Sequence, residues 1–263
     1  MIEVKSISKS FGGVKAVNDT SLTIKKGSIT GLIGPNGAGK TTLFNIIAGN
    51  IKPTSGQILL DGEDVTGFEP HALFAEGLLR TFQLAHEFST LTVLENLMMV
   101  PGEQVGENLM SAWLSWGEVR KQEQEIRERA LDVIGFLNLT HLANELAGNL
   151  SGGQKKLVEL GRTMMVDAKV VLLDEVGAGV NRTLLNDIGD AIVRLNNERG
   201  YTFCMIEHDM DFIGRLCDPV IVMAEGSVLA TGSAEEVKNN EAVIEAYLGR
   251  GVKAKKTDAE AVS

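Results

Sequence analysis

The chain has 263 residues, of which 23% are charged and 44% hydrophobic, and its formal net charge is −10. This length allows one large α/β domain or two small ones, and the acidic balance disfavours nucleic acid as a partner, because proteins that bind it usually carry a basic surface. No stretch approaches the roughly 18 apolar residues that cross a bilayer, and the first residues lack the blocks of a signal peptide. We therefore expect a cytosolic protein unless a partner ties it to a membrane.

Apolar residues at near-alternate positions predict short strands from Met1 to about Asp61. Residues 28–33 form an apolar run that predicts a buried strand, and residues 42–48 have helical character. A glycine-rich segment lies between them. The first part of the chain therefore contains a sheet and then the order strand, loop, helix.

This glycine-rich segment matches the pattern G-x-x-x-x-G-K-[ST] over residues 34–41. Its glycines allow the backbone N–H groups to point at phosphate oxygens, aided by the dipole of the following helix. We expect Lys40 to reach the β- and γ-phosphates and the Thr41 hydroxyl to bind Mg²⁺. The alternative is a glycine-rich turn that matches by chance, and the strand–loop–helix context argues against it. The predicted nucleotide-binding residues of the loop are Gly34, Pro35, Asn36, Gly37, Ala38, Gly39, Lys40, Thr41 and Thr42.

Residues 90–147 change character, because residues 118–139 place Ile126, Ala130, Ile134 and Leu137 on one helical face among many charges. We interpret this region as a helical insert.

A second anion-binding motif is predicted at the start of the next helix. Residues 150–154 precede an amphipathic segment, and free backbone N–H groups gather at such a helix start. The motif is weak when taken alone. Its predicted binding residues are Ser151, Gly152, Gly153 and Gln154.

The last third of the chain has a βαβ pattern, with strands predicted at 169–173 and 201–206 and a helix at 182–198. The first strand ends at Asp174 and Glu175, at the carboxyl edge of a parallel sheet. Acids at strand ends are common surface residues, so taken alone this pair would be read as a solvated surface feature. Together with the phosphate loop, the pair instead indicates a magnesium and catalytic site. We expect Asp174 in the second shell of the metal and Glu175 to orient or deprotonate the attacking water.

Residues 219–223 and 227–231 predict a hairpin, and residues 251–263 show no periodicity and predict a mobile tail. Cys204 and Cys217 follow neither a redox nor a zinc spacing, so we expect buried thiols.

Over roughly residues 2–250 the chain resembles the nucleotide-binding subunit of ATP-binding cassette (ABC) transporters. The resemblance rests on Phe11, on Gln83 in residues 80–83, on residues 150–154 and on His208 in residues 206–209, together with the phosphate loop. It implies that Phe11 stacks on adenine, that Gln83 is a metal ligand beside Thr41 and Asp174, and that His208 contacts the γ-phosphate. The implied catalytic residues are Glu175, His208, Gln83 and Lys40, with ATP and Mg²⁺ as cofactors.

The fold implied by the resemblance is a RecA-like P-loop NTPase core of the α/β class, with an antiparallel β subdomain and a helical insert. We expect the core at about 1–83 and 160–250, the insert at about 84–159, and a flexible tail at 251–263.

The resemblance also implies a head-to-tail dimer, in which ATP on one chain's loop is gripped by Ser151, Gly152 and Gly153 of the other. The implied partners are a second ATPase subunit, identical or different, two transmembrane permease subunits and, indirectly, a solute-binding protein. The chain would then lie on the cytoplasmic face of the plasma membrane, with residues 84–95 as the candidate permease contact.

Two residues depart from the family pattern. Val176 stands where proline commonly follows the catalytic glutamate, and Asn181 stands where the D-loop commonly has aspartate. Neither is expected to touch the phosphates, so we expect activity to survive.

Within the family the chain is most similar to the larger of the two ATPases of branched-chain amino acid importers. The likeness rests on residues 80–83, 91–97, 178–181 and 207–210. Residues 101–117 also fit the longer helical insert of that subunit, and the alternative is that they form a lid over the core of the insert. Residues 243–249 are shared with ATPases of urea importers and lipopolysaccharide exporters, which stay open as alternatives. A non-transport ABC ATPase, the less favoured alternative, usually carries two cassettes, a long coiled coil or a basic surface, and the sequence shows none of these. A P-loop kinase or GTPase would leave residues 151–154, Gln83 and His208 without a role.

Overall fold

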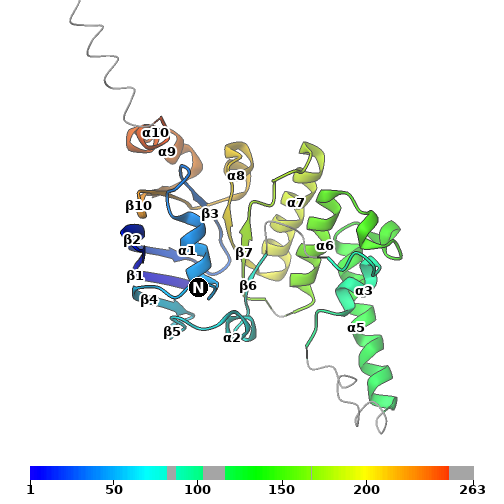
Figure 1. Ribbon diagram of the computed structural model, residues 1–263. Coiled ribbons are helices and arrows are strands. Elements are labelled where there is room, and N and C mark those ends of the chain that lie inside the picture. Colours follow the sequence, from blue (N-terminus) through cyan, green and yellow to red (C-terminus); the bar gives the residue numbers. More distant parts are fainter. Residues whose placement is uncertain (82–86, 103–115, 167, 249–263) are drawn as a thin grey trace, which may run out of the picture. The chain divides into compact units, whose positions relative to one another are not determined.

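The computed structural model describes residues 1–81, 87–102, 116–166 and 168–248 (Figure 1). The chain forms two compact units. The first contains Met1–Arg80, Lys169–Glu175 and Leu195–Ser263, and the second contains Thr81–Ala168 and Val176–Arg194. The helical unit thus includes residues beyond the expected insert of 84–159, because helices from later in the chain pack with it.

The first unit contains an antiparallel sheet of four strands in the order β2-β1-β4-β5. Ile2, Val4 and Ile7 of β1 are buried, so one face of this sheet supplies part of the core. The strands are β1 Ile2–Phe11, β2 Val14–Ile24, β4 Ser55–Leu60 and β5 Glu63–Asp64.

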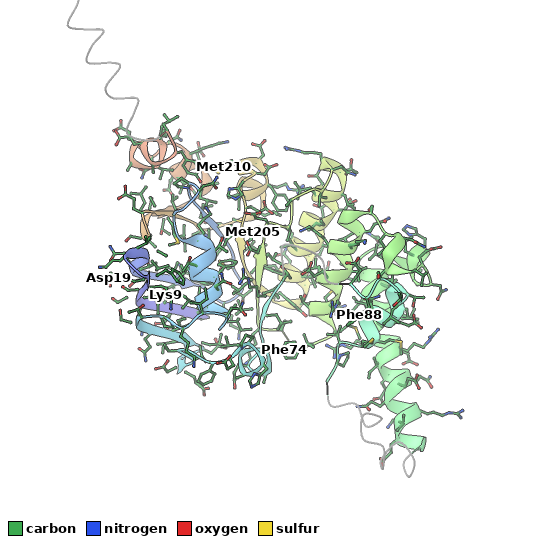
Figure 2. The ribbon with its side chains drawn as sticks, viewed as in Figure 1. Lys9, Asp19, Phe74, Phe88, Met205 and Met210 are labelled. Carbon is green, nitrogen blue, oxygen red and sulfur yellow. The ribbon has the colours of Figure 1, made fainter. Side chains whose placement is uncertain are left out.

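A second sheet of six strands has the order β10-β9-β3-β8-β7-β6. Its neighbours pair in parallel from β9 to β6, and β10 pairs antiparallel with β9, which confirms the predicted parallel sheet and the hairpin. Strands β3, β7 and β8 are buried along their whole length, and Met205 of β8 is fully buried (Figure 2). Such burial explains why they are apolar runs without alternation. The strands are β3 Ile29–Ile33, β6 Leu78–Arg80, β7 Val170–Asp174, β8 Thr202–Ile206, β9 Val220–Ala224 and β10 Ser227–Gly232.

Short helices complete the first unit. Helix α1 begins at Lys40, earlier than the predicted residue 42, because Gly39 takes a left-handed conformation and starts it. The Asp209 carboxylate accepts two backbone N–H bonds at the start of α8. The helices are α1 Lys40–Ile47, α2 Pro70–Ala75, α8 Met210–Leu216, α9 Ala234–Lys238 and α10 Glu241–Leu248.

The second unit is helical, as the sequence predicts. Gly161 of α6 lies against α3 and α5, where an added Cβ would come 2.9 Å from the Leu137 Cδ1 and 3.2 Å from the Leu97 Cδ2. A glycine therefore permits the close packing of these helices. The elements are α3 Val93–Met98, α5 Trp116–Phe136, η2 Thr140–Leu142, η3 Ala147–Asn149, α6 Gly152–Met164 and α7 Arg182–Arg199, the last of which continues into residues of the first unit.

Within the described ranges, no helix is both long and apolar enough to span a bilayer. The predicted tail at 251–263, and residues 103–115 of the segment 101–117, lie outside the described residues.

Candidate active site

The phosphate loop connects β3 to α1 and depends on glycines at defined positions. Gly34, Gly37 and Gly39 have φ values of 148°, 79° and 94°. A Cβ on Gly34 would lie 2.1 Å from the Met223 carbonyl oxygen, and one on Gly39 would lie 2.3 Å from that of Ala16. These two positions therefore exclude any side chain, both by conformation and by space.

Lys40 closes this loop on itself. Its side chain is buried, and its Nζ donates to the carbonyl oxygens of Gly34, at 2.6 Å, and Pro35, at 3.1 Å. Burial lowers the pKa of the Lys40 ammonium, and the negative charges of Glu175 and Asp174 oppose that shift. The cation is thus held at the loop with both acids close enough to act on it.

A pocket of about 330 Å³ lies over the loop. It is at the carboxyl edge of the parallel sheet, where ligands of open α/β sheets bind. Residues 36–42 of the predicted loop meet Glu175 and His208 there, whereas Gly34 and Pro35 of the loop are not among the lining residues. The residues that line it are Val14, Lys15, Ala16, Asn36, Gly37, Ala38, Gly39, Lys40, Thr41, Thr42, Glu175 and His208.

Glu175 and His208 form a contact at the mouth of this pocket. The His208 Nε2 lies 3.0 Å from the Glu175 Oε1, and both side chains are partly exposed. Glu175 has a φ of 50°, uncommon for a residue with a side chain, and its N–H donates to the Ile206 carbonyl at 2.9 Å. The strand neighbour β8 therefore fixes the backbone from which the Glu175 carboxylate projects.

Asp174 is the buried end of β7, with a side chain 2% exposed. Its Oδ2 accepts from the Arg80 Nη2 at 2.6 Å, and its Oδ1 has no hydrogen-bond partner among the described residues. A carboxylate oxygen left in this state can accept from a metal-bound water. The residues present thus fit a Mg²⁺ ion, which commonly takes one or two protein ligands together with phosphates and waters. In the part of the chain that the structure describes, no three His, Cys, Asp or Glu residues cluster as a separate metal site.

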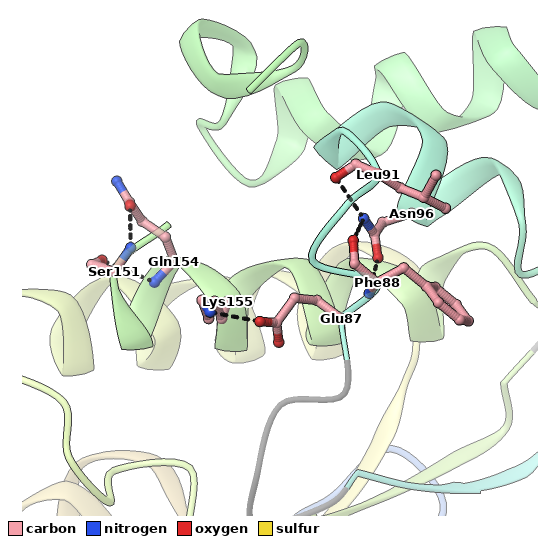
Figure 3. A network of polar contacts seen from close by, with 7 residues as sticks. All are labelled: Glu87, Phe88, Leu91, Asn96, Ser151, Gln154 and Lys155. Atoms are coloured by element: carbon pink, nitrogen blue, oxygen red, sulfur yellow. Dashed lines mark hydrogen bonds and ion pairs between the residues drawn. The ribbon is translucent and has the colours of Figure 1, made fainter. Parts of the chain in front are cut away.

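Ser151 begins helix α6 in the second unit with a capping box. The Ser151 N–H donates to the Gln154 Oε1 at 2.9 Å, and the Gln154 N–H donates to the Ser151 Oγ at 3.4 Å (Figure 3). A Cβ on Gly153 would lie 2.1 Å from the Leu184 Cδ2, whereas one on Gly152 would meet its nearest atom at 3.8 Å. Gly153 is therefore required by the packing of α6 on α7, whereas a Cβ at Gly152 would make only an ordinary contact with the Gly179 carbonyl oxygen.

The segment that follows the undescribed residues 82–86 is fastened to α3 and α6. The Glu87 Oε1 lies 2.6 Å from the Lys155 Nζ of α6 (Figure 3). Asn96, fully buried, accepts from the Phe88 N–H at 2.8 Å and donates to the Phe88 carbonyl at 3.1 Å. Within the helical unit, the described part of the candidate permease contact is therefore tied to the start of α6 through Glu87 and to α3 through Phe88.

Comparison with known proteins adds to this geometry. A family model described as "ABC transporter" matches residues 17–178. The chain belongs to the ABC transporter family. A model described as "Branched-chain amino acid ATP-binding cassette transporter" matches residues 227–253. A protein of Archaeoglobus fulgidus named "Probable branched-chain amino acid transport ATP-binding protein LivG" is 41% identical over 252 residues, 95% of each chain.

Two solved ABC structures have a similar fold. The ADP conformation of an ATP-binding cassette of an ABC transporter is 37% identical, with a TM-score of 0.81 over 95% of this chain and 99% of that one. A dimeric cassette in a post-hydrolysis state with ADP and Pi is 25% identical, with a TM-score of 0.71 over 89% of this chain and 99% of that one. The predicted family and fold class are therefore confirmed.

Phe11, which was expected to stack on the nucleotide, is not among the described residues that line the pocket. Phe11, at the end of β1, is 49% exposed, and the Lys9 Nζ lies 5.3 Å from its ring centroid. The pocket is instead lined by residues 14–16, which the sequence did not single out although they follow Phe11 closely. Gln83 lies outside the described residues, so its expected role stays a prediction.

The two departures from the ABC pattern have local explanations. Val176 is buried, 8% exposed, so an apolar side chain suits its surroundings. The Asn181 Oδ1 accepts the Leu184 N–H at 2.9 Å next to the first turn of α7. Asparagine is as good a residue as aspartate at such a helix start, so the capping contact survives the loss of charge.

Proposed function

We propose that the chain hydrolyses ATP as the nucleotide-binding subunit of an ABC importer for branched-chain amino acids. The observation that carries the proposal is that the phosphate loop, Glu175 and His208 meet at one pocket. The transported solute is proposed from the printed name of the A. fulgidus relative and from the family match at residues 227–253.

In the proposed reaction, backbone N–H groups of the loop and the Lys40 ammonium hold the phosphates. Glu175 orients or deprotonates the attacking water, and His208, 3.0 Å from the Glu175 carboxylate, keeps that carboxylate aimed at the pocket and contacts the γ-phosphate. When bound, Mg²⁺ neutralises charge on the β- and γ-phosphates. Thr41 and Asp174 would hold it, with Gln83 as the further predicted residue.

We also propose that two cassettes share each ATP. The start of α6 offers the N–H groups of Gly152 and Gly153 in its first turn, where helix N–H groups have no partner in the helix, and the Ser151 hydroxyl beside them. At Gly152 even an added Cβ would make only an ordinary contact, so the backbone there is not crowded and an anion can approach it. A related cassette is described as dimeric with ADP and Pi, which supports the same arrangement here. Transmembrane permeases would then be moved by the ATP-driven opening and closing of this dimer, with the chain at the cytoplasmic face of the membrane and its second ATPase either identical or different.

The test is reconstitution of the chain with its copurifying permeases and solute-binding protein in liposomes. We expect ATP-dependent uptake of leucine, isoleucine and valine, and no uptake of urea. Uptake of urea with no uptake of leucine would overturn the proposed solute while leaving the ATPase intact. Absence of phosphate release from the complex would overturn the ATPase itself.

A further inference from the structure

The carboxylate of Asp174 is held in a buried place by a cation from the neighbouring strand. Arg80 ends β6 and pairs in register with Leu172 of β7. Side chains two residues apart on a strand share a face of the sheet, so Arg80, Leu172 and Asp174 point to the same side. This places the Arg80 Nη2 2.6 Å from the Asp174 Oδ2, with the two side chains 12% and 2% exposed. A carboxylate this buried is strongly destabilising unless it is paired.

The same guanidinium also reaches the helix that follows the phosphate loop. The Arg80 Nη1 donates to the Asn45 Oδ1 of α1 at 2.5 Å. Asn45 lies one helical turn after Thr41, so the two share a face of α1. Arg80 therefore connects the strand that ends at Asp174 to the helix face that carries the predicted magnesium ligand Thr41.

The contacts among Arg80, Asn45 and Asp174 require the shape of a guanidinium group. Arg80 uses its two terminal nitrogens on two different acceptors, a geometry that lysine cannot reproduce, because its ammonium is a point charge without a fixed fork. It occupies one oxygen of Asp174 and leaves Oδ1 buried and without a partner among the described residues. The orientation of the carboxylate, and hence the direction in which Oδ1 points, is set by Arg80 and Asn45 together.

We propose that Arg80 is a positioning residue of the ATPase site, which fixes Asp174 relative to α1 so that Oδ1 can accept from Mg²⁺-bound water. The proposal rests on the proposed function, because it assigns Asp174 to magnesium. It separates Arg80 from the residues that touch nucleotide: Arg80 acts through Asp174.

The test is a set of full-length variants, Arg80→Met, Arg80→Lys and Asn45→Ala, with Lys52→Met as a matched control. Lys52 is a cation of the same unit, and its pair with Glu69 is exposed and 3.7 Å long. Binding of a fluorescent ATP analogue is measured in EDTA and across a Mg²⁺ titration, along with kcat and KM for ATP. Thermal unfolding without nucleotide reports on the fold alone.

We expect Arg80→Met to bind the analogue in EDTA nearly as the wild type does, and to need about tenfold more free Mg²⁺, as changes in groups that orient a metal's ligands commonly require. Its kcat at fixed Mg²⁺ falls while KM for ATP changes less. Arg80→Lys keeps the charge and loses the fork, and Asn45→Ala keeps the ion pair and loses its link to α1, so each raises the Mg²⁺ requirement to a smaller extent. Lys52→Met leaves all of these readouts unchanged.

A purely structural role predicts something different. In that case the Arg80 variants lower the unfolding temperature and weaken binding equally with and without Mg²⁺, and this result overturns the inference. If Arg80→Met does not fold, the Mg²⁺ requirements of Arg80→Lys and Asn45→Ala decide the question, and unchanged values in both overturn it. A wild-type chain that neither binds nor hydrolyses ATP would instead overturn the proposed function.

Discussion

Gly153 and Gly152 are neighbours in one motif, yet the structure predicts opposite effects for the same substitution. In Gly153→Ala the new Cβ would lie 2.1 Å from the Leu184 Cδ2, 2.4 Å from its Cγ and 3.1 Å from the Val180 Cγ1. In Gly152→Ala the nearest atom is the Gly179 carbonyl oxygen at 3.8 Å, an ordinary contact. Both residues lie in the first turn of α6, so replacing glycine by alanine changes the helix propensity by nearly the same amount at each position. The difference in stability between the two variants therefore reports the packing.

The magnitude follows from what Leu184 must do. Because the Leu184 Cγ itself lies within the clash, rotating only the terminal methyl groups does not relieve it. The half-buried Leu184 side chain must turn toward solvent, or α6 and α7 must move apart. Overpacking of this kind commonly costs about 1–3 kcal/mol, and we expect about 1–2 kcal/mol here because Leu184 is partly exposed. Gly152→Ala should be stabilising by up to about 0.5 kcal/mol, the lower end of the glycine penalty in helices.

The assay is urea denaturation of both variants, with the free energy of unfolding as the readout. The double variant Gly153→Ala with Leu184→Ala removes the clash, so it should be more stable than the sum of the single changes by about 1 kcal/mol or more. Equal stability of the two glycine variants, or additivity in the double variant, would refute the packing argument for Gly153.

Three further outcomes are expected. Glu175→Gln should bind ATP and accumulate as an ATP-dependent dimer, with phosphate release slowed by about 100-fold or more, as loss of a general base predicts; unchanged release would show that Glu175 is not the base. Glu87→Gln should lower the free energy of unfolding by about 1–3 kcal/mol, because Lys155 stays largely buried without its anion. The control is Glu125→Gln, whose pair with Lys121 is exposed, and this variant should change the free energy of unfolding by less than about 0.5 kcal/mol. Burial raises the pKa of the Cys217 thiol to about 12 and that of Cys204 further, so neither should react with a thiol reagent at pH 8 until urea unfolds the chain. The raised pKa also predicts that the folded state loses stability as pH rises above 9, the ordinary thiol value, and a pH series of urea curves that stays flat there would contradict it.

The elements that the sequence predicted well are those with a strong local pattern. Strands β7 and β8 and helix α7 lie within one residue of their predicted bounds, because an uninterrupted apolar run or a helical period defines each. The ends of α1 and α5 differ because backbone conformation sets them. Gly39 starts α1 from a left-handed conformation, and Asn138, with a φ of 58°, follows the end of α5 at Phe136, earlier than the predicted residue 139.

The parts of the candidate site that come from one continuous sequence motif could be predicted. The contacts between residues far apart in the sequence were harder to predict. The phosphate loop and the Asp174–Glu175 pair are local patterns, and the pocket brings the loop together with Glu175 and His208. The link from Arg80 to Asn45 and Asp174 was not predicted, because it depends on the pairing of the short strand β6 with β7, about ninety residues later. Tertiary pairing of this kind leaves no periodic signal in a single sequence.

The hold that Lys40 has on its own loop has a consequence for the turnover of nucleotide. Its ammonium already donates to two carbonyl oxygens, so an arriving phosphate does not meet a bare cation and must displace acceptors that the chain supplies. When phosphate binds, the Lys40 ammonium exchanges these carbonyl oxygens for phosphate oxygens. The net gain is therefore only part of the roughly 1.5–3 kcal/mol that a charged hydrogen bond can contribute. After the product leaves, the Lys40 ammonium can return to the Gly34 and Pro35 carbonyl oxygens, so a buried cation is not left without acceptors.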